Sequence, residues 1–136
     1  MQTTEIEDRI KIHDLFVRYC SAVDNWDEPA LLCCFTEDGV LETPVLGGRF
    51  AGRDGQREFV LVGHSRAKGG QMRHFFSNLT VQLDSLRATA QSYFVVYSTK
   101  DGKSELSVVG QYKCNLRQLA NEWLFEYRGV SVDSRT

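Results

Sequence analysis

The sequence predicts an α+β domain in which three N-terminal helices pack on one strongly curved, mostly antiparallel sheet. Helical patterns fill the first half of the chain, and four long apolar, β-branched and aromatic runs follow from Met72 onward. The separators between these runs are short, so consecutive strands are expected to pair while the helices cover one face. At 136 residues, the chain is expected to form a single domain over residues 1–136.

The first two predicted helices have recognisable N-terminal caps. In Thr4-Glu5-Ile6-Glu7, the hydroxyl of the threonine and the carboxylate of the last glutamate can satisfy the first free helical amides as a capping box. Asp27 is the expected N-cap of a second helix that runs to about Phe35, with Pro29 in its first turn. The first helix carries an apolar stripe at near-helical spacing, made of Ile6, Ile10, Phe16, Val17, Cys20 and Val23.

The segment between the second helix and Met72 is less regular. A short strand is expected over residues 39–43, followed by a turn at Gly47-Gly48 and a second short strand ending at Phe50. A third helix is expected from Arg53 to about Arg66, although its two internal glycines weaken its helical propensity.

The second half of the chain predicts a four-stranded antiparallel meander. Asp101-Gly102 lies between two of the runs and is one of the stronger hairpin signals. Apolar residues occur at both parities of the strands, so both faces of the sheet are expected to be covered. The helices can cover only one face, and we therefore expect a homo-oligomer, a dimer or trimer, through the outer sheet face. The four runs are 72–84, 86–100, 105–116 and 122–133.

Composition argues against several classes of partner. Apolar residues make up 42% of the chain, enough for a sizeable core. Sixteen basic and 18 acidic residues give a net charge of −2 without a basic tract, so nucleic acid is not an expected partner. The N-terminus lacks the features of a signal peptide, and no apolar run approaches the roughly 18 residues of a membrane span. We expect a soluble, cytoplasmic protein without a membrane partner.

The cysteines and histidines do not have the spacing of metal ligands. Cys20, Cys33, Cys34 and Cys114 contain no CxxC pair and are expected to be reduced and buried, as small apolar side chains. The three histidines are scattered, and the glycine pairs lack the flanking pattern of a phosphate loop. No metal and no cofactor are therefore expected.

His74 is the residue that most directly indicates chemistry. It lies in an apolar, strand-like run, where an imidazole that exchanges a proton near neutral pH needs a partner. Asp24 and Asp27 close the first predicted helix, and since Asp27 is better explained as a helix cap, Asp24 is the candidate partner. Strand alternation places His74, Phe76 and Asn78 on one face, unless a β-bulge shifts the parity.

Five groups of residues occur in a characteristic order along the chain. They are Tyr19…Ala22-Val23-Asp24…Asp27, Leu32…Phe35-Thr36-Glu37-Asp38-Gly39-Val40, Gly48-Arg49-Phe50-Ala51-Gly52-Arg53, Arg73-His74…Asn78-Leu79-Thr80-Val81, and Gly110-Gln111-Tyr112 with Trp123. In this order they resemble the SnoaL-like branch of the nuclear transport factor 2-like (NTF2-like) superfamily over nearly the whole chain. The resemblance implies a cone-shaped α+β barrel whose interior is a ligand pocket.

The resemblance also implies a set of site residues. In dehydratase-like members a tyrosine and an aspartate near the end of the first helix, and a histidine on the first long strand, face the pocket. Tyr19, Asp24 and His74 occupy the matching positions, whereas the second histidine of scytalone dehydratase has no counterpart after His74. Five helical residues rotate by about 140°, so Tyr19 and Asp24 can share one pocket only if the helix unwinds near Val23. The expected substrate-binding residues are Asn78, Phe76, Tyr112, Trp26, Phe35 and Phe59.

These residues lead to an expected activity. The resemblance implies a cofactor-independent lyase or isomerase, which abstracts a proton next to the carbonyl of a small hydrophobic substrate. His74 would be the base, Asp24 would orient it, and Tyr19 would bind the developing enolate.

Two alternatives remain open, because one fold supports many functions. One is a non-catalytic small-molecule-binding or assembly domain, such as a ring-hydroxylating dioxygenase β subunit. The other is an epoxide hydrolase, which needs an Asp-Arg-Asp set; the candidates Asp84, Arg87 and Asp133 all lie near strand ends.

Overall fold

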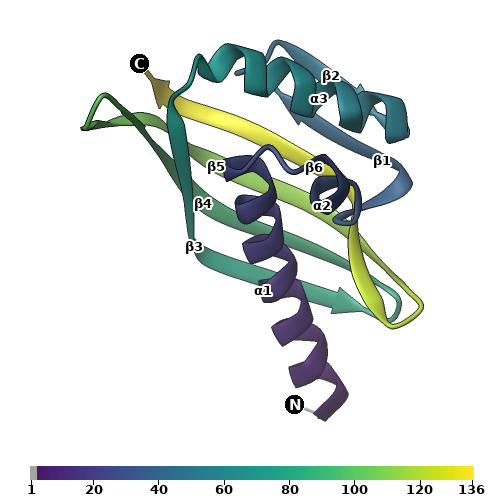
Figure 1. Ribbon diagram of the computed structural model, residues 1–136. Helices are drawn as coiled ribbons and strands as arrows, with labels where there is room; N and C mark the ends of the chain where they lie inside the picture. The colour runs from purple at the N-terminus through teal and green to yellow at the C-terminus, as the bar shows by residue number, and fades with distance from the viewer. Residues whose placement is uncertain (1–2) are drawn as a thin grey trace.

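The computed structural model describes residues 3–136, which form three helices and six strands (Figure 1). The elements occur in the predicted order of helix, helix, two short strands, helix and four long strands. The helices are α1 (Thr3–Asp24), α2 (Glu28–Leu32) and α3 (Gly52–Ala67). The strands are β1 (Phe35–Thr43), β2 (Gly48–Ala51), β3 (Gln71–Asp84), β4 (Arg87–Lys100), β5 (Lys103–Leu119) and β6 (Glu122–Arg135).

All six strands belong to one sheet, in the order β2-β1-β6-β5-β4-β3. Neighbouring strands run antiparallel except β1 and β6, which are parallel. In Figure 1 the long strands curve around α1, while α3 lies over β1 and β2. The predicted α+β class, with helices on one face of a curved and mostly antiparallel sheet, is confirmed.

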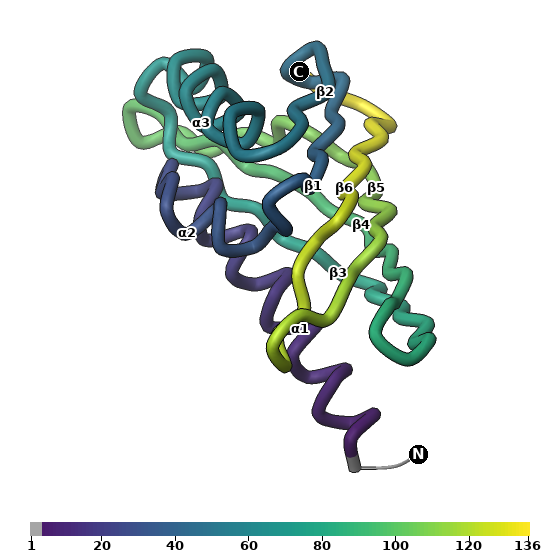
Figure 2. The backbone as a smooth tube through the Cα atoms, turned by 90° about the vertical axis from the view of Figure 1, so that its right-hand side faces the viewer, coloured from purple at the N-terminus to yellow at the C-terminus, as the bar shows by residue number. Residues whose placement is uncertain are grey.

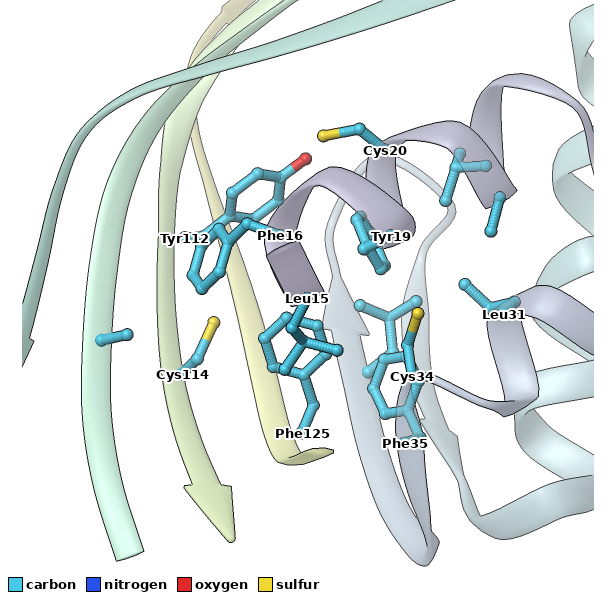
Figure 3. Close-up of a cluster of buried hydrophobic side chains, with 14 of the residues drawn as sticks. Leu15, Phe16, Tyr19, Cys20, Leu31, Cys34, Phe35, Tyr112, Cys114 and Phe125 are labelled. Atoms are coloured by element: carbon cyan, nitrogen blue, oxygen red, sulfur yellow. The ribbon is translucent and has the colours of Figure 1, made fainter. Parts of the chain in front are cut away.

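The inner side of α1 forms the centre of the core. Leu15 and Phe16 are fully buried against the sheet, and Figure 3 shows side chains of α1 between strands β5 and β6 and the segment of Cys34 and Phe35. The predicted apolar stripe is buried only in part, because Ile6, Ile10 and Val17 are exposed. At about 100° per residue these three side chains lie on the side of α1 opposite the buried Leu15 and Phe16. Figure 2 shows the N-terminal end of α1 running past the edge of the sheet.

The turn between α1 and α2 confirms one prediction and corrects another. The Trp26 amide donates to the Val23 carbonyl at 3.1 Å and the Asp27 amide to that of Ala22 at 2.9 Å, the two bonds of a Schellman motif. Asp27 Oδ1 accepts from the Ala30 amide at 3.1 Å, so the predicted cap of α2 is confirmed. The expected unwinding near Val23 is wrong, because α1 remains helical through Asp24.

Other boundaries differ from the expected ones by a few residues. Helix α1 begins at Thr3, so the threonine expected as its cap lies within the first turn. Helix α2 ends at Leu32 and β1 begins at Phe35, four residues before the expected strand. Within residues 3–136 the cysteines are free thiols, and Cys33 is exposed rather than buried. No helix in this range is long and apolar enough to span a membrane.

Two of the irregularities in strand pairing decide which way residues important for the site face. The β3–β4 register shifts between Ser77 and Thr80, around Asn78 at φ 54°. The β5–β6 register shifts where Asn115 pairs with Tyr127 and the next residue of β5 pairs with Phe125, so that Glu126 is an extra residue. A bulge residue turns every later side chain of its strand to the opposite face.

Candidate functional site

A cavity of about 250 Å³ lies between the end of α1, α3 and the inner face of the sheet. Most of its wall is apolar, with contributions from Val23 of α1, Phe59 of α3, and the long strands. Several residues of the wall carry polar groups: Thr43, Ser98 and Ser107, with Tyr19, Tyr112, His74 and Arg66. This is the composition of a small-molecule site, in which a few polar groups orient an apolar ligand.

His74 and Asp24 form a close pair at this cavity. His74 Nδ1 lies 2.6 Å from Asp24 Oδ1, and each side chain is only 10% exposed. The two carboxylate oxygens also accept the backbone amide of His74, at 3.1 and 3.2 Å. Asp24 therefore holds both the backbone and the ring of His74, as the sequence predicted from the pairing of these two residues.

The pairing decides which ring nitrogen is available for chemistry. With the carboxylate accepting from Nδ1–H, the neutral imidazole has its free lone pair on Nε2. The same carboxylate stabilises the imidazolium that forms when Nε2 takes up a proton. His74 lines the cavity, whereas Asp24 does not line it and instead contacts the His74 ring. The imidazole is therefore the group that a ligand would meet.

Tyr19 reaches the cavity without any break in α1. The helical rotation between Tyr19 and Asp24 turns the two side chains toward different strands: the Tyr19 ring packs on Tyr112 of β5, and the Asp24 carboxylate contacts His74 of β3. Tyr19 and His74 therefore both line the cavity. Burial raises the pKa of Tyr19 to about 12, and nearby Arg128 offsets part of this effect. Tyr19 is therefore a neutral hydroxyl, able to donate a hydrogen bond, across the physiological range.

Three of the expected substrate-binding residues line the cavity. Tyr112 does so with Phe94 stacked on its ring, at 4.2 Å between centroids. Trp26 and Phe59 line it from the opposite side. Trp26 holds an unusual left-handed conformation at φ 48°, and its ring occupies the space above Gly63, where a methyl group would collide with the indole.

The other three expected substrate-binding residues lie elsewhere. Asn78 is exposed, because the bulge in β3 turns it away from the face of His74, and its predicted place in the pocket is wrong. Phe76 shares the inner face but packs on His13 and Phe16 rather than on the cavity. Phe35 is fully buried in the core, edge-on to Tyr19.

Arg128, which was not predicted as a site residue, is fully buried behind the cavity-lining Tyr19 and Tyr112. Its guanidinium carbon lies 3.6 Å from the ring centroid of Tyr112 and 3.9 Å from that of Tyr19, with the rings of Phe16 and Phe125 slightly farther away. Strict alternation from Trp123 and Phe125 would have placed Arg128 on the outer face. The extra residue Glu126 reverses the parity, and no local sequence signal indicates that bulge.

The described residues contain no group of three or more histidine, cysteine or acidic side chains able to hold a metal ion. The set needed for an epoxide hydrolase is also not assembled at the cavity. Arg87 pairs with Glu126 at 2.7 Å on the surface, and both Asp84 and Asp133 are exposed.

Comparison with known proteins identifies the family of the chain. A family model described as a SnoaL-like domain matches residues 4–129. The chain belongs to this family. None of the curated proteins searched matches the chain.

Several solved structures are similar to it in fold. A proposed aromatic ring hydroxylase from Novosphingobium aromaticivorans is 28% identical with a TM-score of 0.80, over 96% of this chain and 94% of that one. An NTF2-like protein with a cystatin-like fold from the same organism is 24% identical with a TM-score of 0.84, over 98% and 86%. A proposed scytalone dehydratase, also from that organism, is 20% identical with a TM-score of 0.83, over 100% and 91%. The last two support the fold alone.

Proposed function

We propose that this protein is a cofactor-independent lyase or isomerase that acts on a small, mostly apolar compound bearing a carbonyl group. The observation that carries the proposal is the His74–Asp24 pair at 2.6 Å, almost fully buried beside a cavity of about 250 Å³. A base that is oriented by a carboxylate and shielded from water is suited to remove a carbon-bound proton next to a carbonyl.

In the proposed reaction, Nε2 of His74 takes the proton and the electron pair of the broken C–H bond moves into an enolate. The enolate then expels a β-hydroxyl, which leaves as water after His74 returns the proton, or it takes the proton back at another carbon. The first outcome is a dehydration and the second an isomerisation. By accepting a hydrogen bond from Nδ1–H, Asp24 keeps Nε2 as the nitrogen that accepts the proton, and it stabilises the imidazolium between the two proton transfers.

Tyr19 is proposed to stabilise the enolate oxygen. Its hydroxyl is neutral, because burial raises the pKa of this residue to about 12. A buried donor aimed at a developing oxyanion contributes more in the transition state than in the ground state. Tyr112 lines the same wall, and the pKa of its hydroxyl is also raised by burial, so it can act as a second donor.

The experiment is exchange of the α-protons of a hydroxytetralone into deuterated water, followed by NMR. This probe is a bicyclic ketone with a β-hydroxyl, so exchange reports proton abstraction and loss of the hydroxyl reports dehydration. His74→Gln is expected to lower the exchange rate by about 10²–10⁴-fold, the usual contribution of general base catalysis. His13→Gln is the matched control, because this histidine packs on Phe76 and does not line the cavity. Unchanged exchange in His74→Gln would end the proposal.

A second candidate is a non-catalytic binding or assembly domain, such as a β subunit of a ring-hydroxylating dioxygenase. The observation that favours it is the 28% identity to a proposed aromatic ring hydroxylase. Co-purification with a large subunit that carries an iron–sulfur cluster, together with no proton exchange by either form of the protein, would support this candidate over the enzyme.

A further inference from the structure

Arg128 introduces a positive charge into the interior without a carboxylate partner among residues 3–136. Nη1 donates to the sulfur of Cys114 at 3.3 Å, and Nε and Nη2 have no hydrogen-bond partner among the described residues. Arginine stays protonated in proteins, so titration does not remove this charge. Burying a charge is costly unless something compensates it, and the structure offers only aromatic faces and one sulfur for this purpose.

The neighbouring acids do not supply a negative charge at neutral pH. Burial raises the pKa of Tyr19 to about 12 and that of Cys20 to about 11, although the guanidinium lowers both. Burial likewise raises the pKa of Tyr112 and of Cys114. All four groups are therefore neutral, and the positive charge of Arg128 remains uncompensated at close range.

This charge lies directly behind part of the cavity wall. Tyr19 and Tyr112 contact the guanidinium with their rings, and both residues also line the cavity. A ligand oxygen placed against these two phenols would lie about one ring away from the cation, within a buried region of low dielectric. There a negative oxygen is stabilised and a neutral one gains little, because the interaction of two charges strengthens as the dielectric falls.

We propose that Arg128 makes the cavity selective for ligands with an acidic enol or phenol, which bind as the oxyanion with that oxygen against Tyr19 and Tyr112. This inference rests on the proposed function, since it names the substrate class for the same cavity: ring compounds whose carbonyl ionises to an enolate. Arg128 does not touch the ligand in this arrangement. It is a positioning residue that acts through the two phenols.

Other charged groups face the same cavity and are included in the test. Asp24 on α1 makes three contacts with His74 on β3, while Arg66 on α3 is exposed and lines the cavity. When a phenol ionises in the cavity, its O–H bond breaks and the proton passes to His74 Nε2 or to solvent. The contribution of Arg128 must therefore be measured with and without His74.

The experiment is a pH titration of para-nitrophenol bound to the protein, followed by absorbance, because phenol and phenolate absorb at different wavelengths. The bound probe is expected to ionise at least about one pH unit lower in the wild type than in Arg128→Met, a tenfold preference for the anion. The same difference is expected in the His74→Gln background, so failure of the proposed catalysis and failure of this inference are distinguishable. Nitrobenzene, which cannot ionise, should bind equally to all variants.

Three results would overturn the inference. They are equal ionisation of the bound probe in wild type and Arg128→Met, binding of the neutral phenol alone by the wild type, and no binding of either form. If Arg128→Met fails to fold, as shown by loss of nitrobenzene binding, Tyr112→Phe replaces it, because this variant keeps the cation and the ring but removes one donor. If Tyr112→Phe binds the phenolate with the same preference as the wild type, the inference is also overturned.

Discussion

His74 and Arg128 are two basic side chains on the inner face of one sheet, and only His74 has a carboxylate partner. His74 is held by Asp24 at 2.6 Å, whereas Arg128 lies among four aromatic rings with two guanidinium nitrogens unpaired within the described chain. The first arrangement keeps a titratable group oriented and ready to take a proton. The second keeps a permanent charge behind the cavity wall without a compensating carboxylate among the described residues. The comparison shows that the burial of a basic side chain does not by itself define its role, because the role depends on which groups the side chain contacts.

The largest expected effect comes from removing the charge of the histidine's partner. Asp24→Asn keeps the size of the side chain but no longer stabilises the imidazolium or selects the Nδ1–H tautomer. Proton exchange from the hydroxytetralone probe should fall by about 10³-fold, within the range for general base catalysis. Asp27→Asn is the control, because asparagine is also a good N-cap and this residue caps α2 instead of contacting His74. Equal losses in the two variants would show that the effect is structural.

Stability measurements sharpen the same contrast. Asp24→Ala leaves the buried ring and amide donors of His74 without a partner, and should lower the free energy of unfolding by about 2–3 kcal/mol. Arg128→Met removes an uncompensated charge and keeps an apolar side chain, so the change should be within about 1 kcal/mol or stabilising. Urea denaturation of both variants checks this order. A larger destabilisation by Arg128→Met would mean that the aromatic contacts outweigh the cost of burying the charge.

Tyr19 lies on the guanidinium, and its ionisation provides a pH test. Its pKa is about 12 in the folded protein and near 10.0 when exposed, so the unfolded chain loses this proton first. Stability is therefore fully present below pH 10 and falls as the pH rises to about 12, by about 2–3 kcal/mol for two units. Tyr19→Phe removes this part of the alkaline loss, measured as unfolding free energy against pH. Parallel curves for the two proteins would show that Tyr19 is not buried as a neutral phenol.

A substitution on the outer face of the sheet is expected to have the smallest effect on the site. Phe75, on the opposite side of β3 from His74, is 57% exposed and packs edge-on against Tyr97. Oligomerisation through this face remains a prediction from the sequence. Phe75→Asp should lower the mass found by sedimentation equilibrium and leave the His74–Asp24 pair intact. Leu61→Asp is the control, since this exposed leucine lies on α3. The same mass for wild type and Phe75→Asp would remove the outer face as the interface.

Local sequence signals predicted the parts of the molecule that depend on short-range physics. Asp27 was recognised as a cap because the bond between its side chain and the Ala30 amide is a three-residue interaction. The hairpin at Asp101-Gly102 follows from two residues that both adopt positive φ, at 53° and 75°. The pairing of His74 with Asp24 is a long-range contact, and it was predicted from the family resemblance and from the need of an imidazole for a carboxylate.

The sequence alone therefore determined the order of the elements, the cap of α2 and the hairpin at Asp101-Gly102, and it predicted the contact between His74 and Asp24. Only the tertiary structure decided that Asn78 faces outward, that Arg128 faces inward, and that Phe76 packs in the core away from the cavity. For Asn78 and Arg128 the physical reason is a bulge: a single unpaired residue reverses the parity of a strand, and its position is set by pairing with a neighbouring strand. Phe76 keeps the predicted face, and its contacts with α1 decide that it packs away from the cavity. Alternation within one strand carries no information about that pairing.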